Sequence, residues 1–232
     1  MTSPHILMVA TSAAQIGRAK HTTGLWLEEL TSPYYAFVDA GAQVTVASIA
    51  GGAIPVDPNS IDASNQDHPS VKRYGVDLVL QERLSSTSAF AVLDSEDFDA
   101  LFLPGGHGTM ADYPGNAALA KLVARYDAAE KLIAAVCHGP AGLVSARKAD
   151  GSSVLQGRKV TGFTDSEERA VGLADIVPFL LETRLRDLGA EFHRGPDFEP
   201  FVVRDRNLIT GQNPASAAPA AATLLEAFRD PA

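Results

Sequence analysis

The only cysteine of the chain, Cys137, ends an apolar run and is followed at once by a histidine, a glycine and a proline. The run from Leu132 to Val136 is typical of a buried strand, and residues 141–144 are compatible with a helix. A sharp strand–turn–helix elbow lifts the side chain at its bend clear of the sheet and needs small neighbours, here Ala135 and Gly139. The amino-terminal end of a helix stabilises a thiolate. The segment therefore predicts an ionised, nucleophilic Cys137 that a substrate can reach.

A lone cysteine in an apolar run is more often a small buried hydrophobe, but burial of a sulfur does not require His138, Gly139 and Pro140 beside it. A nucleophilic thiol needs a base, an orienting group and donors for an oxyanion. His138 is the adjacent base, and the alternative is that its ring only caps the following helix. A redox sensor is a further interpretation, although the chain has no second cysteine that could resolve a sulfenic acid.

A second turn motif, Gly-Gly-His-Gly at residues 105–108, follows another strand-like stretch. Because parallel strands end at one edge of a sheet, the backbone N–H groups of Gly105 and Gly106 can face the sulfur and, with the N–H of His138, hold a developing oxyanion. Phosphate binding is the usual alternative for a glycine pair, but no P-loop lysine follows, and the motif is not a dinucleotide fingerprint. We interpret His107 as a loop residue that lines the pocket rather than as a second catalytic base.

Acidic side chains at two places can complete such a site. Glu28 and Glu29 lie in an amphipathic stretch after the first strand, where one can turn inward or both can face solvent. A second acidic group consists of Asp165, Glu167 and Glu168. It is either an ordinary acidic start of a helix or the segment that supplies a carboxylate to orient the catalytic imidazole. The 6 histidines are dispersed and no C-x-x-C or H-E-x-x-H occurs, so the spacing indicates neither a metal site nor a cofactor.

Alternating strand-like and helix-like stretches must position these groups. Strands are predicted at residues 6–10, 44–48, 100–104, 132–136, 159–161 and 207–210. Helices are predicted at residues 24–40, 117–129, 173–188 and 214–228. We expect Pro178 to kink or delay the third helix and Asn213 to cap the last. The alternation predicts an α/β fold, a mostly parallel sheet sandwiched by helices, with its site at the carboxyl ends of the strands.

Length, charge and cysteine content restrict the class of protein. The 232 residues suit a single domain, which we predict over residues 1–232 with a loop insertion around 51–88. One cysteine allows no intrachain disulfide, and the amino-terminal segment lacks the features of a signal peptide. No stretch has the apolar length of a membrane span, and a net charge of −9 opposes nucleic acid and anionic membranes. We therefore expect a cytoplasmic protein that binds neither nucleic acid nor membrane.

Several segments together resemble the ThiJ/PfpI superfamily, a branch of the class I glutamine amidotransferase-like fold. They resemble its nucleophile elbow (AAVCHGP), its oxyanion loop (LPGGHG), the helix with a pocket glutamate (TGLWLEE), the segment with an acidic triad member (TGFTDSEE) and the final strand and helix (LITGQNPAS). The last two segments are similar to the larger chaperone/glyoxalase III branch. The resemblance runs from about residue 6 to residue 228 and implies a flavodoxin-like sheet with a nucleophile elbow.

This resemblance also implies roles for individual residues. Cys137 would be the nucleophile and His138 its base. Glu168 would orient the imidazole, and Glu29 would be the pocket carboxylate near the sulfur. Gly106 would donate a hydrogen bond to the oxyanion. Glu167 adjoins Glu168 and is the alternative orienting group. Desolvation and a nearby thiolate should raise the pKa of Glu29.

The leading hypothesis is a cofactor-independent, glyoxalase III-like lyase of the glutathione-independent D-lactate dehydratase type. It would detoxify methylglyoxal or glyoxal, small α-oxoaldehydes, by converting them to lactate or glycolate. The alternatives are a stress-related holdase chaperone, suggested by the apolar residues Trp26, Tyr34, Tyr35 and Phe37, a protein deglycase, and a cysteine amidase or peptidase. Residues 193–195 lack the His-x-Glu pair of glutamine hydrolysis. Because superfamily members usually form homodimers, we expect a homodimer.

Overall fold

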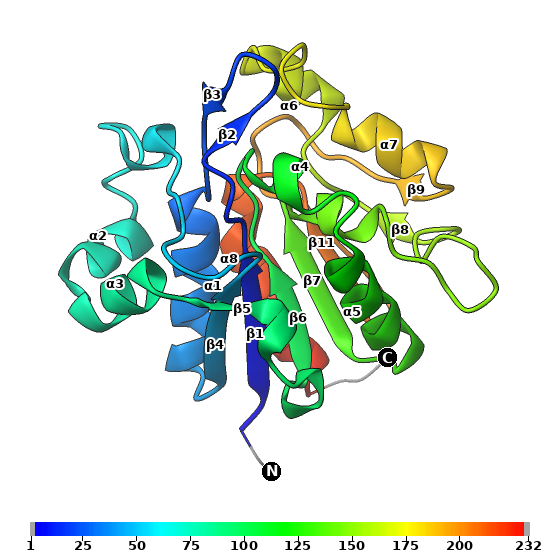
Figure 1. Ribbon diagram of the computed structural model, residues 1–232, viewed down its shortest axis with the longest axis horizontal. Helices are drawn as coiled ribbons and strands as arrows, with labels where there is room; N and C mark the ends of the chain where they lie inside the picture. The colour runs from blue at the N-terminus through cyan, green and yellow to red at the C-terminus, as the bar shows by residue number, and fades with distance from the viewer. Residues whose placement is uncertain (1–2, 230–232) are drawn as a thin grey trace.

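Seven buried or half-buried strands form one sheet that runs through the molecule (Figure 1). The computed structural model describes residues 3–229 of the chain. The strand order is β10-β11-β7-β6-β1-β4-β5, and every neighbouring pair is parallel except β10 with β11. In chain order the strands are β1 (His5–Ala10), β4 (Gln43–Ser48), β5 (Ser88–Ala89), β6 (Ala100–Leu103), β7 (Leu132–Val136), β10 (Val202–Asp205) and β11 (Leu208–Gly211). The predicted α/β sandwich with a mostly parallel sheet is confirmed.

Helices cover both faces of this sheet, because its strands are apolar on both sides. Helices α1 (Leu27–Asp39) and α8 (Ala217–Ala227) pack together on one face, and α5 (Ala117–Ala128) lies on the other (Figure 1). Alternate residues of β1 separate the two cores: Leu7 packs on the α5 side, and Ile6 on the α1 and α8 side. The carboxyl ends of β1, β6 and β7 therefore meet at one edge of the sheet.

Smaller elements lie around the main sheet (Figure 1). A second sheet pairs β8 (Lys159–Val160) with β9 (Glu191–Phe192), close to α6 (Asp165–Ala170) and α7 (Leu181–Asp187). The remaining strands and α-helices are β2 (Gln15–Ile16), β3 (His21–Thr22), α2 (Pro69–Val76), α3 (Leu78–Ser85) and α4 (Thr109–Asp112). Short 3-10 helices lie at Pro58–Ile61, Phe90–Val92, Ser95–Asp97, Gly139–Leu143 and Pro214–Ser216.

Three predicted elements differ from the structure. The strand predicted at residues 159–161 lies outside the main sheet, because β8 pairs with β9 and with no other strand of residues 3–229. The helix predicted at residues 173–188 begins at Leu181, after Pro178, whose ring and missing N–H disfavour a helix interior. The last helix starts with a 3-10 turn that Asn213 and Ser216 cap reciprocally.

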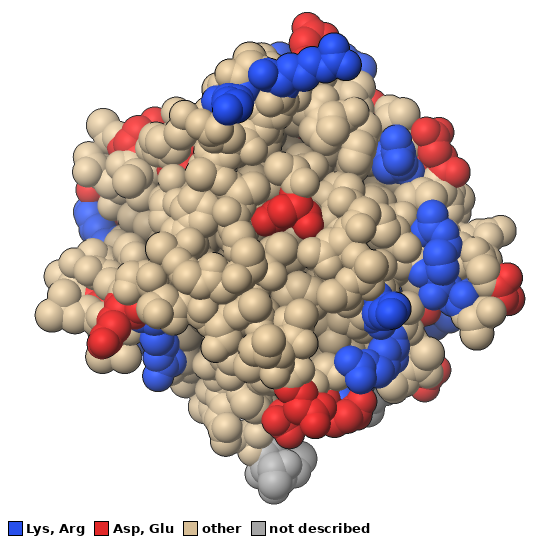
Figure 2. All heavy atoms as spheres, in the orientation of Figure 1, with Lys and Arg blue, Asp and Glu red and all other residues tan. Residues whose placement is uncertain are grey.

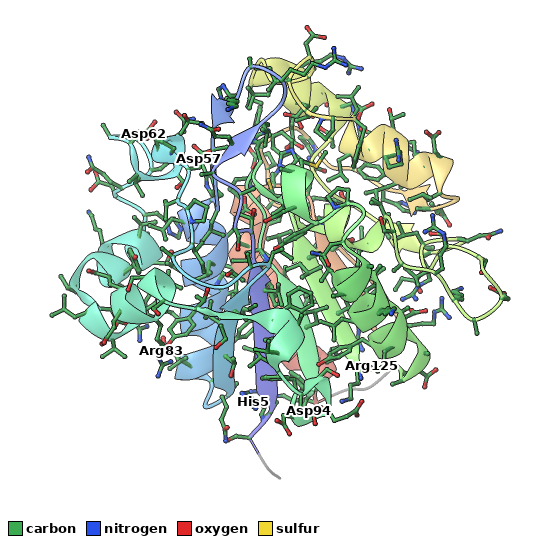
Figure 3. All side chains as sticks on the ribbon, viewed as in Figure 1. His5, Asp57, Asp62, Arg83, Asp94 and Arg125 are labelled. Carbon is green, nitrogen blue, oxygen red and sulfur yellow. The ribbon has the colours of Figure 1, made fainter. Side chains whose placement is uncertain are left out.

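The segment 51–88 contains η1 (Pro58–Ile61), α2 and α3. Its residue Asp57 makes a hydrogen bond to Thr23, outside the segment. The Asp57 carboxylate, labelled in Figure 3, accepts hydrogen bonds from the Thr23 hydroxyl (2.7 Å) and the Asn59 N–H (2.9 Å). Asp57 thereby caps the 3-10 helix and holds this loop region near the start of α1. The assignment of residues 1–232 to one domain stays a prediction.

The face shown in Figure 2 carries most of its charged side chains around the rim, and its broad tan centre is interrupted by an acidic patch. Of the aromatic side chains that suggested a client-binding surface, Tyr34, Tyr35 and Phe37 of α1 are buried in the core and Trp26 is partly buried, so these four residues form no exposed apolar surface. Within residues 3–229, no helix is both long and apolar enough to cross a membrane.

Candidate active site

Cys137 occupies a strained turn directly after β7. Its φ is +57°, in the left-handed region that costs a residue with a side chain about 1–2 kcal/mol. The backbone on either side is fixed: the Cys137 N–H donates to Gly211 O, and the Cys137 carbonyl accepts the Phe163 N–H, both at 2.9 Å. A Cβ on Gly139 would overlap the Leu103 carbonyl, so the elbow needs glycine there. Such strain is retained mainly where function requires it.

A chain of polar contacts leads from the sulfur to α6. Cys137 Sγ lies 3.3 Å from Nδ1 of His138, and Nε2 of His138 lies 2.7 Å from Oε2 of Glu168. All three residues are buried, and Cys137 is 4% exposed. The Phe163 ring lies against the His138 ring at 4.5 Å between centroids, which fixes the plane of the imidazole. The structure thus brings a thiol, an imidazole and a carboxylate into the order that nucleophilic catalysis requires.

Glu168 also binds a second imidazole, that of His107. His107 Nε2 lies 2.7 Å from Oε1 of Glu168, and the centroids of the two histidine rings are 4.0 Å apart. Burial acts to raise the pKa of Glu168, but the two histidines outweigh it and hold that pKa well below its usual range. An ionised carboxylate only accepts hydrogen bonds, so both Nε2 atoms donate. The interpretation of His107 as a lining residue was therefore incomplete.

Glu29 approaches the sulfur from α1. Its carboxylate is fully buried and accepts a 2.9 Å hydrogen bond from the Gly105 N–H through Oε2. Oε1 makes no hydrogen bond within the described residues, and the carboxyl group as a whole lies close enough to the Cys137 thiol to interact with it. Burial raises the pKa of Glu29 well above its ordinary value, against the effect of the hydrogen bonds from Cys137 and Gly105. The expected rise in the pKa of Glu29 is confirmed.

The turn after β6 supplies one backbone N–H to the sulfur, not two. The Gly106 N–H faces Cys137 and favours the ionised thiol. Gly106 has a φ of +95°, and a Cβ there would overlap the Gly24 carbonyl and the Trp26 N–H, so only glycine fits. The prediction that Gly105 also faces the sulfur is wrong, because its N–H is already bound by Glu29. The His138 N–H donates to no atom within residues 3–229, and its nitrogen lies against Gly105.

The electrostatics of the site correct the expectation of a resting thiolate. Burial raises the pKa of the Cys137 thiol well above its ordinary value, and the charge of Glu29 and its hydrogen bond raise it further. Burial and the nearby His107 lower the pKa of His138, although Glu168 acts in the opposite direction. The following helix is only a 3-10 segment, Gly139–Leu143, so its dipole is weak. The resting pair is thus a neutral thiol beside a neutral imidazole.

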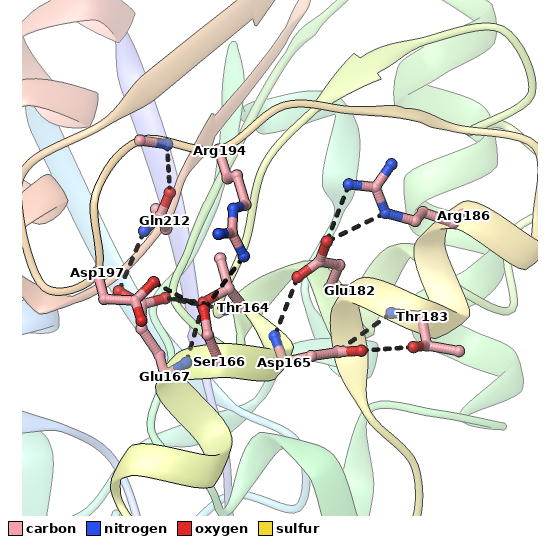
Figure 4. Close-up of polar contacts among 11 residues, drawn as sticks. Thr164, Asp165, Ser166, Glu167, Glu182, Thr183, Arg186, Arg194, Asp197 and Gln212 are labelled. Carbon is pink, nitrogen blue, oxygen red and sulfur yellow. Dashed lines mark hydrogen bonds and ion pairs between the residues drawn. The ribbon is translucent and has the colours of Figure 1, made fainter.

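Glu167, the neighbour of Glu168, makes its hydrogen bonds to groups other than the two histidines. Its carboxylate accepts hydrogen bonds from the Phe198 N–H (2.8 Å), Asn213 Nδ2 (2.8 Å) and Gln212 Nε2 (3.1 Å), and it forms a capping box with Thr164. Figure 4 shows Glu167 next to Gln212 at the start of α6, where a second chain links Asp165, Glu182 and Arg186. These contacts anchor α6 and leave Glu168 to reach His138.

Residues 22–227 match the DJ-1/PfpI family. The chain belongs to this family. It is 30% identical over 215 residues to glyoxalase 3 of Candida albicans, across 89% of this chain and 90% of that protein. It is 29% identical over 220 residues to the glutathione-independent glyoxalase HSP31 of Saccharomyces cerevisiae, across 90% of each. The crystal structure of glyoxalase III from Candida albicans superposes with a TM-score of 0.88 at 27% identity and covers 97% of both chains. The predicted resemblance to the ThiJ/PfpI superfamily and its glyoxalase III-like branch is confirmed.

The two histidines and the glutamate at this site are residue types that bind transition metals. One ligand atom from each of His107, His138 and Glu168 lies within 4.8 Å of the others. Each imidazole Nε2, however, donates its hydrogen to a separate carboxylate oxygen. A metal ion would have to displace both of these hydrogens and with them the contact that orients His138.

Proposed function

We propose that this DJ-1/PfpI family member is a glutathione-independent glyoxalase that converts methylglyoxal to lactate and glyoxal to glycolate. The observation that carries this proposal is the 3.3 Å contact between Cys137 Sγ and His138 Nδ1, backed by Glu168 at 2.7 Å and by Glu29 beside the sulfur. It occurs in a chain whose relatives of 29–30% identity over most of their length are named glyoxalases.

The first step adds the thiol to the aldehyde. The Sγ proton moves to His138 Nδ1 as the sulfur bonds to the aldehyde carbon, and the Glu168 carboxylate stabilises the imidazolium that forms. The N–H groups of Gly106 and His138 hold the new oxyanion, which takes the proton back to give a hemithioacetal. Because the thiol ionises only in this step, the buried neutral pair of the resting site is compatible with the chemistry.

The second step moves hydrogen between the two substrate carbons. A base removes the proton from the former aldehyde carbon to form an enediol, and an acid returns a proton to the adjacent carbon, which leaves a thioester of the hydroxy acid. We assign this exchange to Glu29, with His138 as the alternative. Burial raises the pKa of the Glu29 carboxyl well above its ordinary value, which makes the carboxylate a stronger base, and general acid–base catalysis of this kind contributes roughly 100- to 10,000-fold.

The third step is hydrolysis. Water adds to the thioester carbonyl, the bond between carbon and sulfur breaks, and the hydroxy acid leaves with the thiol restored. The 4% exposure of Cys137 favours a substrate of a few heavy atoms over a peptide chain, which argues against the amidase or peptidase alternative.

The direct test is lactate formation from methylglyoxal in the absence of glutathione. We expect turnover by the wild-type protein and none by Cys137→Ala, whose folding is verified by circular dichroism. Equal lactate formation by both proteins would refute the proposal. Aggregation suppression that persists in Cys137→Ser without any lactate formation would favour the holdase alternative.

Two further features belong to the proposal. We expect a homodimer, which light scattering after size-exclusion chromatography would show as twice the chain mass of 24.4 kDa. We also place the protein in the cytoplasm, because its single thiol suits a reducing compartment. Fractionation of the source cells tests that location.

A further inference from the structure

Two imidazole rings share the Glu168 carboxylate, although only one of them contacts the sulfur. His107 Nε2 is bound to Oε1 and His138 Nε2 to Oε2, each at 2.7 Å. Because both Nε2 atoms donate to an ionised carboxylate, both rings carry their lone pair on Nδ1. Glu168 therefore holds two histidines, not one, in the tautomer of a general base oriented by a carboxylate.

The two rings differ in access to solvent. The His138 side chain is 0% exposed, and its Nδ1 faces Cys137 Sγ. The His107 side chain is 11% exposed. Nδ1 of His107 makes no hydrogen bond within residues 3–229. It is also absent from the buried side-chain atoms of these residues that lack a hydrogen-bond partner, so it is accessible to solvent. His107 thus presents an oriented Nδ1 lone pair on the more exposed of the two rings.

We propose that His107 is the general base that activates water for hydrolysis of the thioester on Cys137. The water oxygen bonds to the thioester carbonyl carbon while one of its protons moves to Nδ1 of His107. The tetrahedral oxyanion then collapses, and the bond between carbon and sulfur breaks to give the hydroxy acid and the Cys137 thiolate. The proton held by His107 restores the thiol through a water molecule. This inference rests on the proposed function for its natural substrate.

The geometry assigns the two histidines to different steps. His138 is sealed against the sulfur, where it handles the thiol proton during addition. The His107 ring lies against the His138 ring at 4.0 Å between centroids, so it is next to the ring that contacts Cys137 Sγ. Glu168 stabilises an imidazolium on either ring, because each of its oxygens already binds one of them. One carboxylate therefore supports both halves of the reaction.

The test separates formation of the acyl-enzyme from its hydrolysis. In His107→Gln, the amide N–H can still donate to Glu168, but no base remains. With methylglyoxal, we measure the amount of thioester on Cys137 by trapping it with hydroxylamine. With p-nitrophenyl acetate, the first burst of nitrophenolate reports formation of the acyl-enzyme, and the steady release that follows reports its hydrolysis. We expect the burst to persist and hydrolysis to fall about 100- to 10,000-fold. Hydroxylamine, a nucleophile that needs no general base, should restore release.

The matched control is His193→Gln, which makes the same change in a half-exposed histidine that pairs with Glu191 at 2.9 Å outside the site. It should leave both phases unchanged. An equal fall in formation and hydrolysis in His107→Gln, or no rescue by hydroxylamine, would show that His107 only positions Glu168 and would overturn the inference.

The two substrates distinguish this inference from the proposed function. Ester hydrolysis that depends on His107, without lactate from methylglyoxal, would leave the role of His107 standing and remove the glyoxalase proposal. Lactate formation that is unaffected in His107→Gln would support the glyoxalase proposal and overturn the role of His107. A wild-type protein that hydrolyses neither substrate would overturn both.

Discussion

Glu168 on α6 lies 2.7 Å from Nε2 of His138, which follows β7, although 30 residues separate them in the sequence. This contact joins the elbow to a helix outside the main sheet and turns the lone pair of His138 toward Cys137. The orientation of the base therefore depends on where α6 is anchored. That anchoring is provided by Glu167, so two adjacent carboxylates have separate tasks.

Substituting each of these glutamates should separate catalysis from stability. In Glu168→Gln, the amide cannot stabilise the imidazolium, so we expect kcat to fall about 1,000- to 10,000-fold. Glu167→Gln should lose several hydrogen bonds to a buried acceptor and lower the free energy of unfolding by about 3 kcal/mol. Steady-state kinetics and urea denaturation of both variants provide the measurement. A Glu167→Gln protein that is fully stable but as inactive as Glu168→Gln would contradict this division.

Glu29 should act in proton transfer without a large share in folding. Glu29→Gln keeps an oxygen for the Gly105 N–H but cannot exchange protons with the substrate. We expect kcat to fall roughly 100-fold or more, with KM and the melting temperature little changed. Glu28→Gln is the matched control, because Glu28 is adjacent, partly exposed and paired with His68 at 3.4 Å. Similar losses in the two variants would show that the effect arises from the helix rather than from the carboxyl beside the sulfur.

Asp112 should make folding stability depend on pH. Burial raises its pKa from 3.8 to about 6, against hydrogen bonds from the Ser12 N–H (2.7 Å) and the Thr11 hydroxyl (2.9 Å). Because the folded pKa is the higher one, this contribution to stability is fully present below pH 3.8 and is lost as pH rises through about 6. The rise in pKa corresponds to at most about 3 kcal/mol, less for a partly exposed group.

The difference in unfolding free energy between wild type and Asp112→Asn isolates this group from all other titrations. We expect the wild type to lose stability relative to the variant between pH 4 and pH 7, with the change centred near pH 5 to 6. Urea denaturation at four pH values measures the difference. A constant difference across this range would contradict the raised pKa of Asp112.

The left-handed backbone at Cys137 should be visible in stability. Cys137→Gly and Cys137→Ala both remove the sulfur, but only glycine adopts a φ of +57° without strain. We expect the glycine variant to be more stable than the alanine variant by about 1 kcal/mol, as measured by chemical denaturation. An alanine variant that is the more stable of the two would show that the elbow is not strained.

The sequence pattern predicted the sheet well, because its long apolar runs become buried parallel strands. It missed β10, a half-buried strand of four residues that includes Arg204 and Asp205, since such a short, charged edge strand lacks a clear apolar pattern. The choice between Glu167 and Glu168 needed the direction of α6, because adjacent helix residues point to different sides. A local signal was present, however: Thr164 and Glu167 have the spacing of a capping box, which engages Glu167 and leaves Glu168.

Other features of the site carried no local signal. The hydrogen bond between His107 and Glu168 joins residues that are 61 positions apart in the sequence. The hydrogen bond from the Gly105 N–H to the Glu29 carboxylate joins residues that are 76 positions apart. The neutrality of the thiol follows from burial, which depends on how the loops close over the elbow.

The most direct test of the account is the chemical state of Cys137 during turnover. The protein is mixed with isotopically labelled methylglyoxal, quenched in acid within milliseconds to seconds and digested, and the peptide that contains Cys137 is analysed by mass spectrometry. The account predicts one labelled three-carbon unit bound to Cys137 that forms and decays at rates compatible with lactate release. Full turnover with an unmodified Cys137 at every time point would contradict it.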